Sequence, residues 1–226
     1  MNRKQFVIGT LLVFAAIVVL VLYMNKQDSA VQENGGNQSG KQPSIENQPT
    51  VGEEEAPVSI IEFGDYKCPS CKAWGERVYP ELEKDFINNG QVKFSYINVL
   101  FHGKESVLAS LASEWVFKNH PDAFWNFHNA LFAAQPASQQ HDERWVTPEA
   151  LATYAQATVP GIDLEKFNAD LKEQKTLDEV KRDDQLVKEA NIQFTPSIMI
   201  NGVLIEDPFD YEAIVSQIEK ELEKQK

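Results

Sequence analysis

The apolar residues of this chain change their spacing several times, and each change predicts a different element. Residues 58–63 form a nearly continuous apolar run, which predicts a buried strand in which Glu62 is the only charge. A helix is predicted to begin near Pro69 and to be kinked at Pro80, and residues 91–99 alternate like a second strand. Together these elements predict a β-α-β unit with a right-handed crossover.

Helical spacing prevails between residues 102 and 190. Thr147 and Pro148 are typical of a helix start, with a hydroxyl at the N-cap and a proline at the first helical position. Residues 163–190 predict one long helix or two shorter ones. We expect the aromatic side chains of this region to form the core of a helical subdomain, and a peptide-binding groove is the alternative. These side chains are Trp115, Phe124, Trp125, Phe127, Phe132 and Trp145.

Sheet character returns toward the C-terminus. Residues 197–200 and 203–205 are predicted strands, and Asn201-Gly202 between them is typical of a tight hairpin turn. Thr195-Pro196 precedes the first of these strands, where a cis X-Pro bond in a tight turn is one of the geometries open to it. Residues 211–224 carry apolar side chains on one face and predict a final helix.

The first part of the chain predicts a membrane anchor. Residues 6–24 are apolar and follow Arg3 and Lys4, so we expect a transmembrane segment with a cytoplasmic tip of residues 1–5. An uncleaved anchor is favoured over a cleaved signal peptide, because the apolar run is long and no convincing cleavage site follows. Residues 25–50 are rich in Gln, Asn, Ser and Gly, which predicts a disordered tether. The expected protein is therefore a single-pass protein of the cell membrane whose main domain lies outside the cytoplasm.

Composition narrows the classes of function. The formal net charge of −13 argues against nucleic-acid binding, because phosphate contacts need a cationic surface. A hydrophobic content of 42% is enough for one sizeable domain or two small ones. The chain has only 2 cysteines, so its stability is expected to come from a hydrophobic core and not from a disulfide framework.

Those cysteines, Cys68 and Cys71, enclose Pro69 and Ser70 at the predicted junction of strand and helix. The first turn of a helix stabilises a thiolate, so we expect Cys68 to be an exposed nucleophile of lowered pKa and Cys71 to be its buried resolving partner. A zinc site is a weaker alternative, because two further ligands are missing at suitable spacing. A structural disulfide is weaker too, because closing so short a loop stabilises little.

The charge of Glu62 within an apolar strand allows two interpretations. Glu62 could lie at the edge of a sheet and reach solvent. It could instead be a buried acid beneath the cysteines, with a pKa raised by desolvation, that exchanges protons with Cys71.

The histidines are predicted to lie at the surface or at helix ends, because none has a partner at ligand spacing. They are His102, His120, His128 and His141. His102 directly follows the second predicted strand, so a role in modulating the redox site stays open for it.

Four carboxylates share one predicted helix: Asp178, Glu179, Asp183 and Asp184. A solvated helix face is the expected explanation, and a weak calcium site is the alternative. No other cofactor is expected beyond a redox-active disulfide.

The order β-α-β then β-β-α resembles the thioredoxin fold, with Cys68-Pro69-Ser70-Cys71 opening the first helix and Thr195-Pro196 opening the third strand. Residues 51–101 and 191–226 would form this α/β domain, and residues 102–190 would be a helical insertion. Such an insertion is similar to that of the DsbA family of thiol-disulfide oxidoreductases. The predicted anchor, the F-G-D-Y-x-C-P-x-C signature and the later F-H-G most resemble its Gram-positive BdbD-type branch.

The resemblance implies a role for each matching residue. The nucleophilic cysteine falls on Cys68, the resolving cysteine on Cys71 and the buried acid on Glu62. The cis-proline falls on Pro196, with Thr195 as the variable residue before it.

The two residues between the cysteines would tune the redox properties. These are Pro69 and Ser70. Many family members have a histidine where this chain has Ser70, so a hydroxyl replaces a cation near the thiolate, which implies a weaker oxidant than the strongest members.

The resemblance also implies an activity and partners. The expected enzyme is a disulfide oxidase that acts on unfolded exported proteins with cysteine thiols, and a DsbB-like, quinone-linked membrane protein would reoxidise it. A reductase or isomerase of the same fold is the nearest alternative. A tethered binding or chaperone module with a structural disulfide is an alternative from another class, and a cation-binding surface domain is a third.

Overall fold

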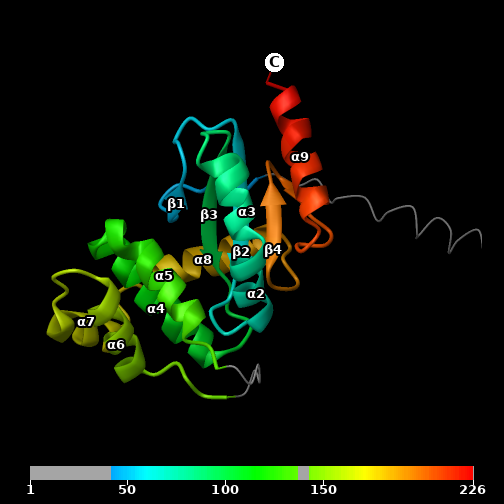
Figure 1. Ribbon diagram of the computed structural model, residues 1–226. Coiled ribbons are helices and arrows are strands. Elements are labelled where there is room, and N and C mark those ends of the chain that lie inside the picture. The colour runs from blue at the N-terminus through cyan, green and yellow to red at the C-terminus, as the bar shows by residue number, and fades with distance from the viewer. Residues whose placement is uncertain (1–41, 137–142, 226) are drawn as a thin grey trace, which may run out of the picture. The chain divides into compact units, whose positions relative to one another are not determined.

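The computed structural model describes residues 42–136 and 143–225, which form a sheet with helices on both of its faces (Figure 1). The strand order is β1-β3-β2-β4-β5. Strands β2 and β3 are parallel, and the other neighbouring strands are antiparallel. The strands are β1 (Thr50–Val51), β2 (Val58–Gly64), β3 (Val92–Asn98), β4 (Ser197–Ile200) and β5 (Val203–Leu204).

The helices fall into two groups along the chain. Those outside the segment between β3 and β4 are α2 (Pro69–Arg77), α3 (Tyr79–Leu82), the π-helix η1 (Glu83–Ile87) and α9 (Tyr211–Glu223). Those between β3 and β4 are α4 (Lys104–Asn119), the 3-10 helix η2 (Pro121–Ala123), α5 (Phe124–Ala133), α6 (Pro148–Thr158), α7 (Leu164–Lys172) and α8 (Leu177–Glu189). The second group occupies the range where the sequence predicts a helical insertion.

The alternation of side chains along β2 explains why both faces of the sheet are covered. Ile60 packs with Trp74 of α2 and Ile214 of α9 on one face. Ile61 packs with Val187 of α8 on the opposite face. A strand buried on both faces needs apolar residues at nearly every position, which explains the continuous apolar run of residues 58–63.

The helices after β3 share a core of their own, built largely from aromatic side chains. Phe127 is fully buried there, and Trp115 packs edge-on against Phe167 with ring centroids 5.0 Å apart. The predicted aromatic core is confirmed, because Trp125 and Trp145 also pack against it.

Two helical predictions are refined by the backbone. The first helix is interrupted and not merely kinked, since α2 ends at Arg77 and a new helix carries Pro80 in its first turn. Proline cannot donate to the preceding turn, so the hydrogen-bond ladder stops there. Residues 163–190 form two helices, α7 and α8, and Gln174 between them has a φ of 54° that no regular helix continues.

The predicted tether is wrong for residues 42–50, which are ordered against the sheet. Gln42 Nε2 donates to Ser59 Oγ over 2.9 Å. The short strand β1 pairs with β3, and Gln48 Nε2 donates to Asp183 Oδ1 over 2.7 Å. Polar composition predicted disorder here, but main-chain pairing and buried amide contacts hold the segment in place.

The predicted tip and anchor, residues 1–5 and 6–24, lie outside the described residues, as does the tether as far as residue 41. Within residues 42–136 and 143–225, no helix is long and apolar enough to cross a bilayer.

Candidate active site

The two cysteines lie where β2 runs into α2. Cys68 is the N-cap of α2, and Pro69 is at its start, where a missing N–H costs no helical hydrogen bond. Both cysteines are buried: Cys68 is 4% exposed and Cys71 is 1% exposed. The expectation of an exposed Cys68 is therefore wrong, because the loop before β4 packs over it and places Thr195 O 3.3 Å from Cys68 Sγ.

The environment of Cys68 favours its thiolate. A hydrogen bond from the Cys71 thiol has the largest effect, and the side chain of Thr195 and the N–H groups of Ser70 and Cys71 add to it. Burial opposes them, yet together these contacts lower the pKa of Cys68 to about 6. The pKa of Cys68 is thus lowered, as the sequence predicts, but mainly by the Cys71 thiol, and the N–H groups at the start of α2 contribute less.

The environment of Cys71 has the opposite effect. Burial raises the pKa of the Cys71 thiol well above its ordinary value, and the hydrogen bond it gives to Cys68 adds to the shift. The N–H of Asp65 lies 3.5 Å from Cys71 Sγ and weakly opposes this. Two thiols three residues apart therefore differ strongly in acidity.

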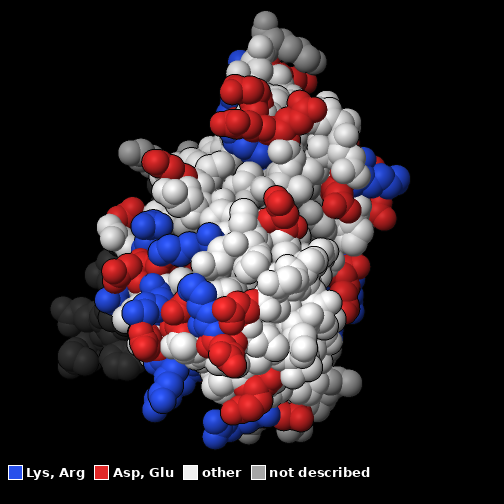
Figure 2. Space-filling model, turned by 90° about the vertical axis from the view of Figure 1, so that its left-hand side faces the viewer, with Lys and Arg blue, Asp and Glu red and all other residues white. Residues whose placement is uncertain are grey.

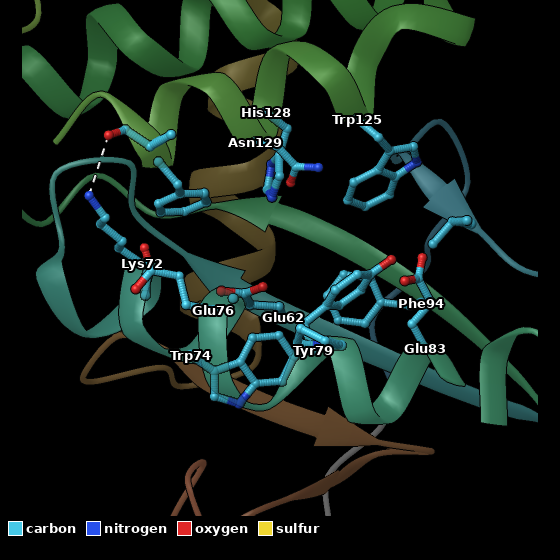
Figure 3. Close-up of a pocket in the computed structure, with 16 residues that line it drawn as sticks. Glu62, Lys72, Trp74, Glu76, Tyr79, Glu83, Phe94, Trp125, His128 and Asn129 are labelled. Carbon is cyan, nitrogen blue, oxygen red and sulfur yellow. Dashed lines mark hydrogen bonds between the residues drawn. The ribbon is translucent and has the colours of Figure 1, made fainter. Parts of the chain in front are cut away.

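Glu62 is a buried acid and does not reach solvent. Its strand, β2, lies between β3 and β4 in the sheet, so the edge interpretation is wrong. Its side chain lies on the same face as α2, is 3% exposed, and has no hydrogen-bond partner for Oε1 among the described residues. Burial raises the pKa of the Glu62 carboxyl to about 8, and the charge of Cys68 contributes. Figure 3 shows the Glu62 carboxylate between His128 and Trp74.

The pairing of β4 with β2 brings Thr195 and Pro196 to the cysteines. The bond between them is cis, as the sequence allowed, and Ser197 then begins β4. Strand β4 pairs with β2, with Ser197 opposite Phe63. This register brings residues that are far apart in the chain to the same end of the sheet as Cys68.

A buried carboxylate beside the cysteines was missed in the sequence. Asp65 is 1% exposed and its Oδ2 accepts hydrogen bonds from His102 Nδ1 over 2.8 Å and from Ser106 Oγ over 2.9 Å. The hydrogen bond between Asp65 and His102 is the main reason why the pKa of His102 is raised, and the charge of Cys68 raises this pKa further. His102 therefore lies close enough to sense the thiolate electrostatically, as one of its two interpretations required. An aspartate three residues before a cysteine nucleophile is the signal that could have revealed it.

Lys67, the residue before Cys68, was missed as well. Its ammonium is buried and contacts Glu105 Oε2 at 3.1 Å and the carbonyl oxygen of Glu143 at 2.5 Å. The same ammonium lies 5.9 Å from the ring centroid of Trp145. A lysine next to the motif thus joins the cysteine loop to the helical region.

The surface interpretation is wrong for His128. It lies on α5 inside the aromatic core, and Tyr66 OH is 3.0 Å from its Nδ1. Burial lowers the pKa of His128 to about 3, so the ring is neutral. His141 lies outside the described residues.

The four carboxylates of α8 do not share one face. Asp178 is exposed, whereas Asp183 is buried, so the solvated interpretation is wrong for Asp183. Asp183 Oδ2 accepts from Asn98 Nδ2 over 2.8 Å, and the same amide donates to Glu114 Oε1 over 2.8 Å. Burial raises the pKa of both carboxyls. Among the described residues, no three His, Cys, Asp or Glu side chains converge as metal ligands.

Comparison with known proteins agrees with this geometry. The family model described as thioredoxin matches residues 44–220. The chain is 46% identical over 190 residues to disulfide bond formation protein D of Bacillus subtilis, and the match covers 84% of each chain. The chain belongs to the thioredoxin family and, within it, to the group of disulfide bond formation protein D.

Solved structures show the same fold. The crystal structure of oxidised BdbD from Bacillus subtilis superposes on this protein with a TM-score of 0.78, covering 84% of this chain and 100% of that one at 46% identity. DsbA from Chlamydia trachomatis has a TM-score of 0.70 at 21% identity, covering 81% of this chain and 95% of that one, which shows the fold alone. The predicted thioredoxin fold is confirmed.

The arrangement suits dithiol-disulfide exchange. Cys68 is a stabilised thiolate and hence a good leaving group, whereas Cys71 holds its proton tightly. Glu62 and Cys71 line one cavity, and the charge of Glu62 contributes to the raised pKa of Cys71, so the acid is near enough to act on the sulfur that must gain or lose a proton.

Proposed function

We propose that this protein introduces disulfide bonds into exported proteins through Cys68 and Cys71. The contrast between the two thiols carries the proposal, since the pKa of Cys68 is lowered to about 6 while that of Cys71 is raised. Reduction of such a disulfide releases a stable thiolate, so the disulfide is readily donated. The clients are unfolded or partly folded proteins with cysteine thiols.

The first step forms a mixed disulfide. A client thiolate attacks Cys68 Sγ, the Cys68–Cys71 bond breaks, and its electron pair goes to Cys71. Cys71 is a poor thiolate in this environment, so it needs a proton as it leaves. Glu62 has a pKa of about 8, is mostly protonated at neutral pH, and supplies that proton.

The second step releases the oxidised client. A second client thiolate attacks the client sulfur of the mixed disulfide, and Cys68 leaves as a stabilised thiolate. The client loses two electrons, which the Cys68–Cys71 pair has gained. The main-chain groups near Pro196, beside the start of β4, would pair with an extended client whatever its sequence.

The reduction potential tests the direction of the reaction. Members of this fold with nucleophile pKa values near ~3.5 and ~7 have potentials near −120 and −270 mV, respectively. A pKa of about 6 for Cys68 supports a potential between these two values. Equilibration of the full chain with glutathione buffers and trapping of free thiols should give a value between roughly −120 and −230 mV. A value near or below about −270 mV would support a reductase or isomerase, and unchanged activity in Cys68→Ser would support a binding module.

Reoxidation would occur at the membrane. The apolar residues 6–24 support a single-pass anchor with the catalytic domain outside the cytoplasm, and an anchored oxidase needs an electron acceptor nearby. A DsbB-like, quinone-linked membrane protein fits that role. With Cys71→Ser, Cys68 should remain in a mixed disulfide with this partner, and recovery of no such adduct from membranes would argue against it.

A structural calcium ion is proposed for the buried network of α8, β3 and α4. Two carboxylates and two amides meet there, namely Asp183, Glu114, Asn98 and Gln48. The Gln48 and Asn98 amides turn their N–H groups toward the two carboxylates, and Gln48 Oε1 has no hydrogen-bond partner among the described residues. The carboxylate oxygens and Gln48 Oε1 would be the ligands, because calcium prefers oxygen. A cation would also compensate the cost of burying two acids side by side.

A further inference from the structure

A cavity of about 450 Å³ lies beside the active site, between α2, α3 and α5. This volume is within the range of pockets for small molecules. Its inner residues, Glu62, Cys71 and Phe94, are buried, whereas Glu76 and Asn129 are exposed at its outer end. The cavity therefore leads from the surface to Glu62.

A hydrogen-bond donor is missing at the inner end. Glu62 Oε1 lacks a partner among residues 42–136 and 143–225 although the side chain is only 3% exposed. A buried acceptor without a donor is costly, so a ligand that supplies an N–H there gains affinity. Figure 3 shows this carboxylate pointing into the space between α2 and α5.

The walls of the cavity suit a flat, positively charged ligand. Aromatic side chains surround it: Trp74, Tyr79, Phe94, Trp125 and Phe132. Their faces attract cations and stack on planar groups. Glu76 and Glu83 add negative charge toward the outer end, whereas the Lys72 ammonium is bonded to the carbonyl oxygens of Ala133 and Gln135 at 3.3 Å each.

We propose that this cavity binds a small planar organic cation whose N–H groups donate to the Glu62 carboxylate. The cation lies between the aromatic walls with its charged end at Glu62. Since Glu62 has a pKa of about 8, binding of the cation displaces the carboxyl proton. A bound cation therefore holds Glu62 in the form that cannot protonate Cys71.

Several titratable or charged groups face or surround Glu62, and they decide how the test is designed. They are Cys68, Cys71, Tyr66, Tyr79, Tyr96, His128, Lys72, Glu76 and Glu83. The buried tyrosines have raised pKa values, and His128 stays neutral down to a pKa of about 3. Both cysteines are free thiols in this structure, where the pKa of Glu62 is about 8. In the disulfide form neither cysteine titrates and the contribution of the Cys68 charge is lost, but burial, the larger cause, still raises the pKa of Glu62. Among the groups around the cavity, Glu62 is therefore the one expected to gain charge as the pH rises.

The test is titration calorimetry of the full chain, in the disulfide form, with benzamidinium and with its neutral isostere benzamide. Benzamidinium keeps its charge from pH 6.5 to 8.5. Its affinity should be about tenfold higher at pH 8.5 than at pH 6.5, because Glu62 must lose a proton to bind it. Benzamide should bind more weakly at pH 8.5 and without this pH dependence.

Variants identify the site. Glu62→Gln should abolish the pH dependence and weaken benzamidinium binding at pH 8.5, and Trp125→Ala should weaken it at both pH values. Glu212→Gln makes the same chemical change on the exposed side of α9 and should leave binding unchanged. The proposal would be overturned if the two probes bound with equal affinity or if neither bound. It would also be overturned if the pH dependence of benzamidinium binding persisted in Glu62→Gln. These outcomes do not depend on the direction of the redox reaction.

Discussion

At the scale of single residues, the reactivity of this protein comes from unequal burial and hydrogen bonding of a few polar groups. Cys68 accepts hydrogen bonds that favour its charged form, whereas Cys71 and Glu62 lose solvation without equivalent contacts. The three groups are close enough to influence one another, so a change at one should be measurable at another.

The first prediction concerns the hydrogen bond between the thiols. The pH dependence of iodoacetamide alkylation of reduced protein should give a midpoint of about 6 for Cys68. Cys71→Ala removes the donor with the largest effect and should raise this midpoint by about 1 unit or more. Cys71→Ser keeps a donor and should shift it less. A midpoint above about 7 in the unmodified protein would contradict both the assignment and the proposed oxidase.

The second prediction concerns Glu62 and pH. The folded-state pKa of Glu62, about 8, lies above its ordinary value of 4.5, so the stability of the folded state falls as pH rises through this interval. Glu62→Gln should remove this loss and raise the free energy of unfolding of the dithiol form by up to about 4 kcal/mol at pH 8.

Urea denaturation at pH 5 and pH 8 measures this effect. Glu212→Gln, an exposed acid on α9, is the matched control and should change stability little at either pH. If the unmodified protein and Glu62→Gln lose stability equally between the two pH values, the buried acid is not the cause.

At the scale of elements, the cysteine loop is attached to the helical region through Lys67. The partner carboxylate, Glu105 on α4, also accepts the N–H groups of Trp145 and Val146 just before α6. The start of α2, the start of α4 and the segment leading to α6 therefore meet at one buried ion pair. Helices distant in sequence are positioned relative to the active site by this contact.

The third prediction follows from the burial of this pair. The Lys67 side chain is 3% exposed and that of Glu105 is 18% exposed. Lys67→Met leaves a carboxylate without its cation and should lower the free energy of unfolding by about 2 kcal/mol. Lys118→Met, which breaks the ion pair of Lys118 and Glu179 with Lys118 57% exposed, should cost less than about 1 kcal/mol. Equal losses in urea denaturation would mean that Lys67 is not a structural anchor.

At the scale of the whole molecule, the buried network around Asp183 joins the N-terminal segment, the sheet and the helical region. Gln48 contributes from the chain before β1, Asn98 from β3 and Glu114 from α4. On the face shown in Figure 2, basic side chains (Lys, Arg) are intermixed with acidic ones (Asp, Glu), and they form no continuous basic surface there. A net charge of −13 favours the approach of cations to the molecule.

The fourth prediction tests the proposed calcium ion in this network. Calcium at about tenfold over its dissociation constant should stabilise the fold by about 1.4 kcal/mol, which corresponds to a rise in Tm of about 3 °C for a domain of this size. Asp183→Asn should abolish the rise, and Asp178→Asn, an exposed change on the same helix, should preserve it. A rise that is unaffected by Asp183→Asn would place calcium elsewhere.

The sequence by itself determined the order of elements and the location of the redox chemistry. Two local signals were recognisable in the sequence: Cys68 and Cys71 at a strand-helix junction, and Thr195-Pro196 before a strand. The hairpin at Asn201-Gly202 and the helix start at Thr147 were local in the same way, and both are confirmed.

Only the tertiary structure decided which polar residues are buried. Glu62 could be at an edge or in the centre of a sheet until β4 was found beside β2, and Asp183 and His128 appeared to be surface residues until their neighbours on other elements were known. Burial, and with it the pKa of each acid and base, depends on contacts between residues far apart in the chain. The sequence therefore located the reactive cysteines, and the fold set their acidity.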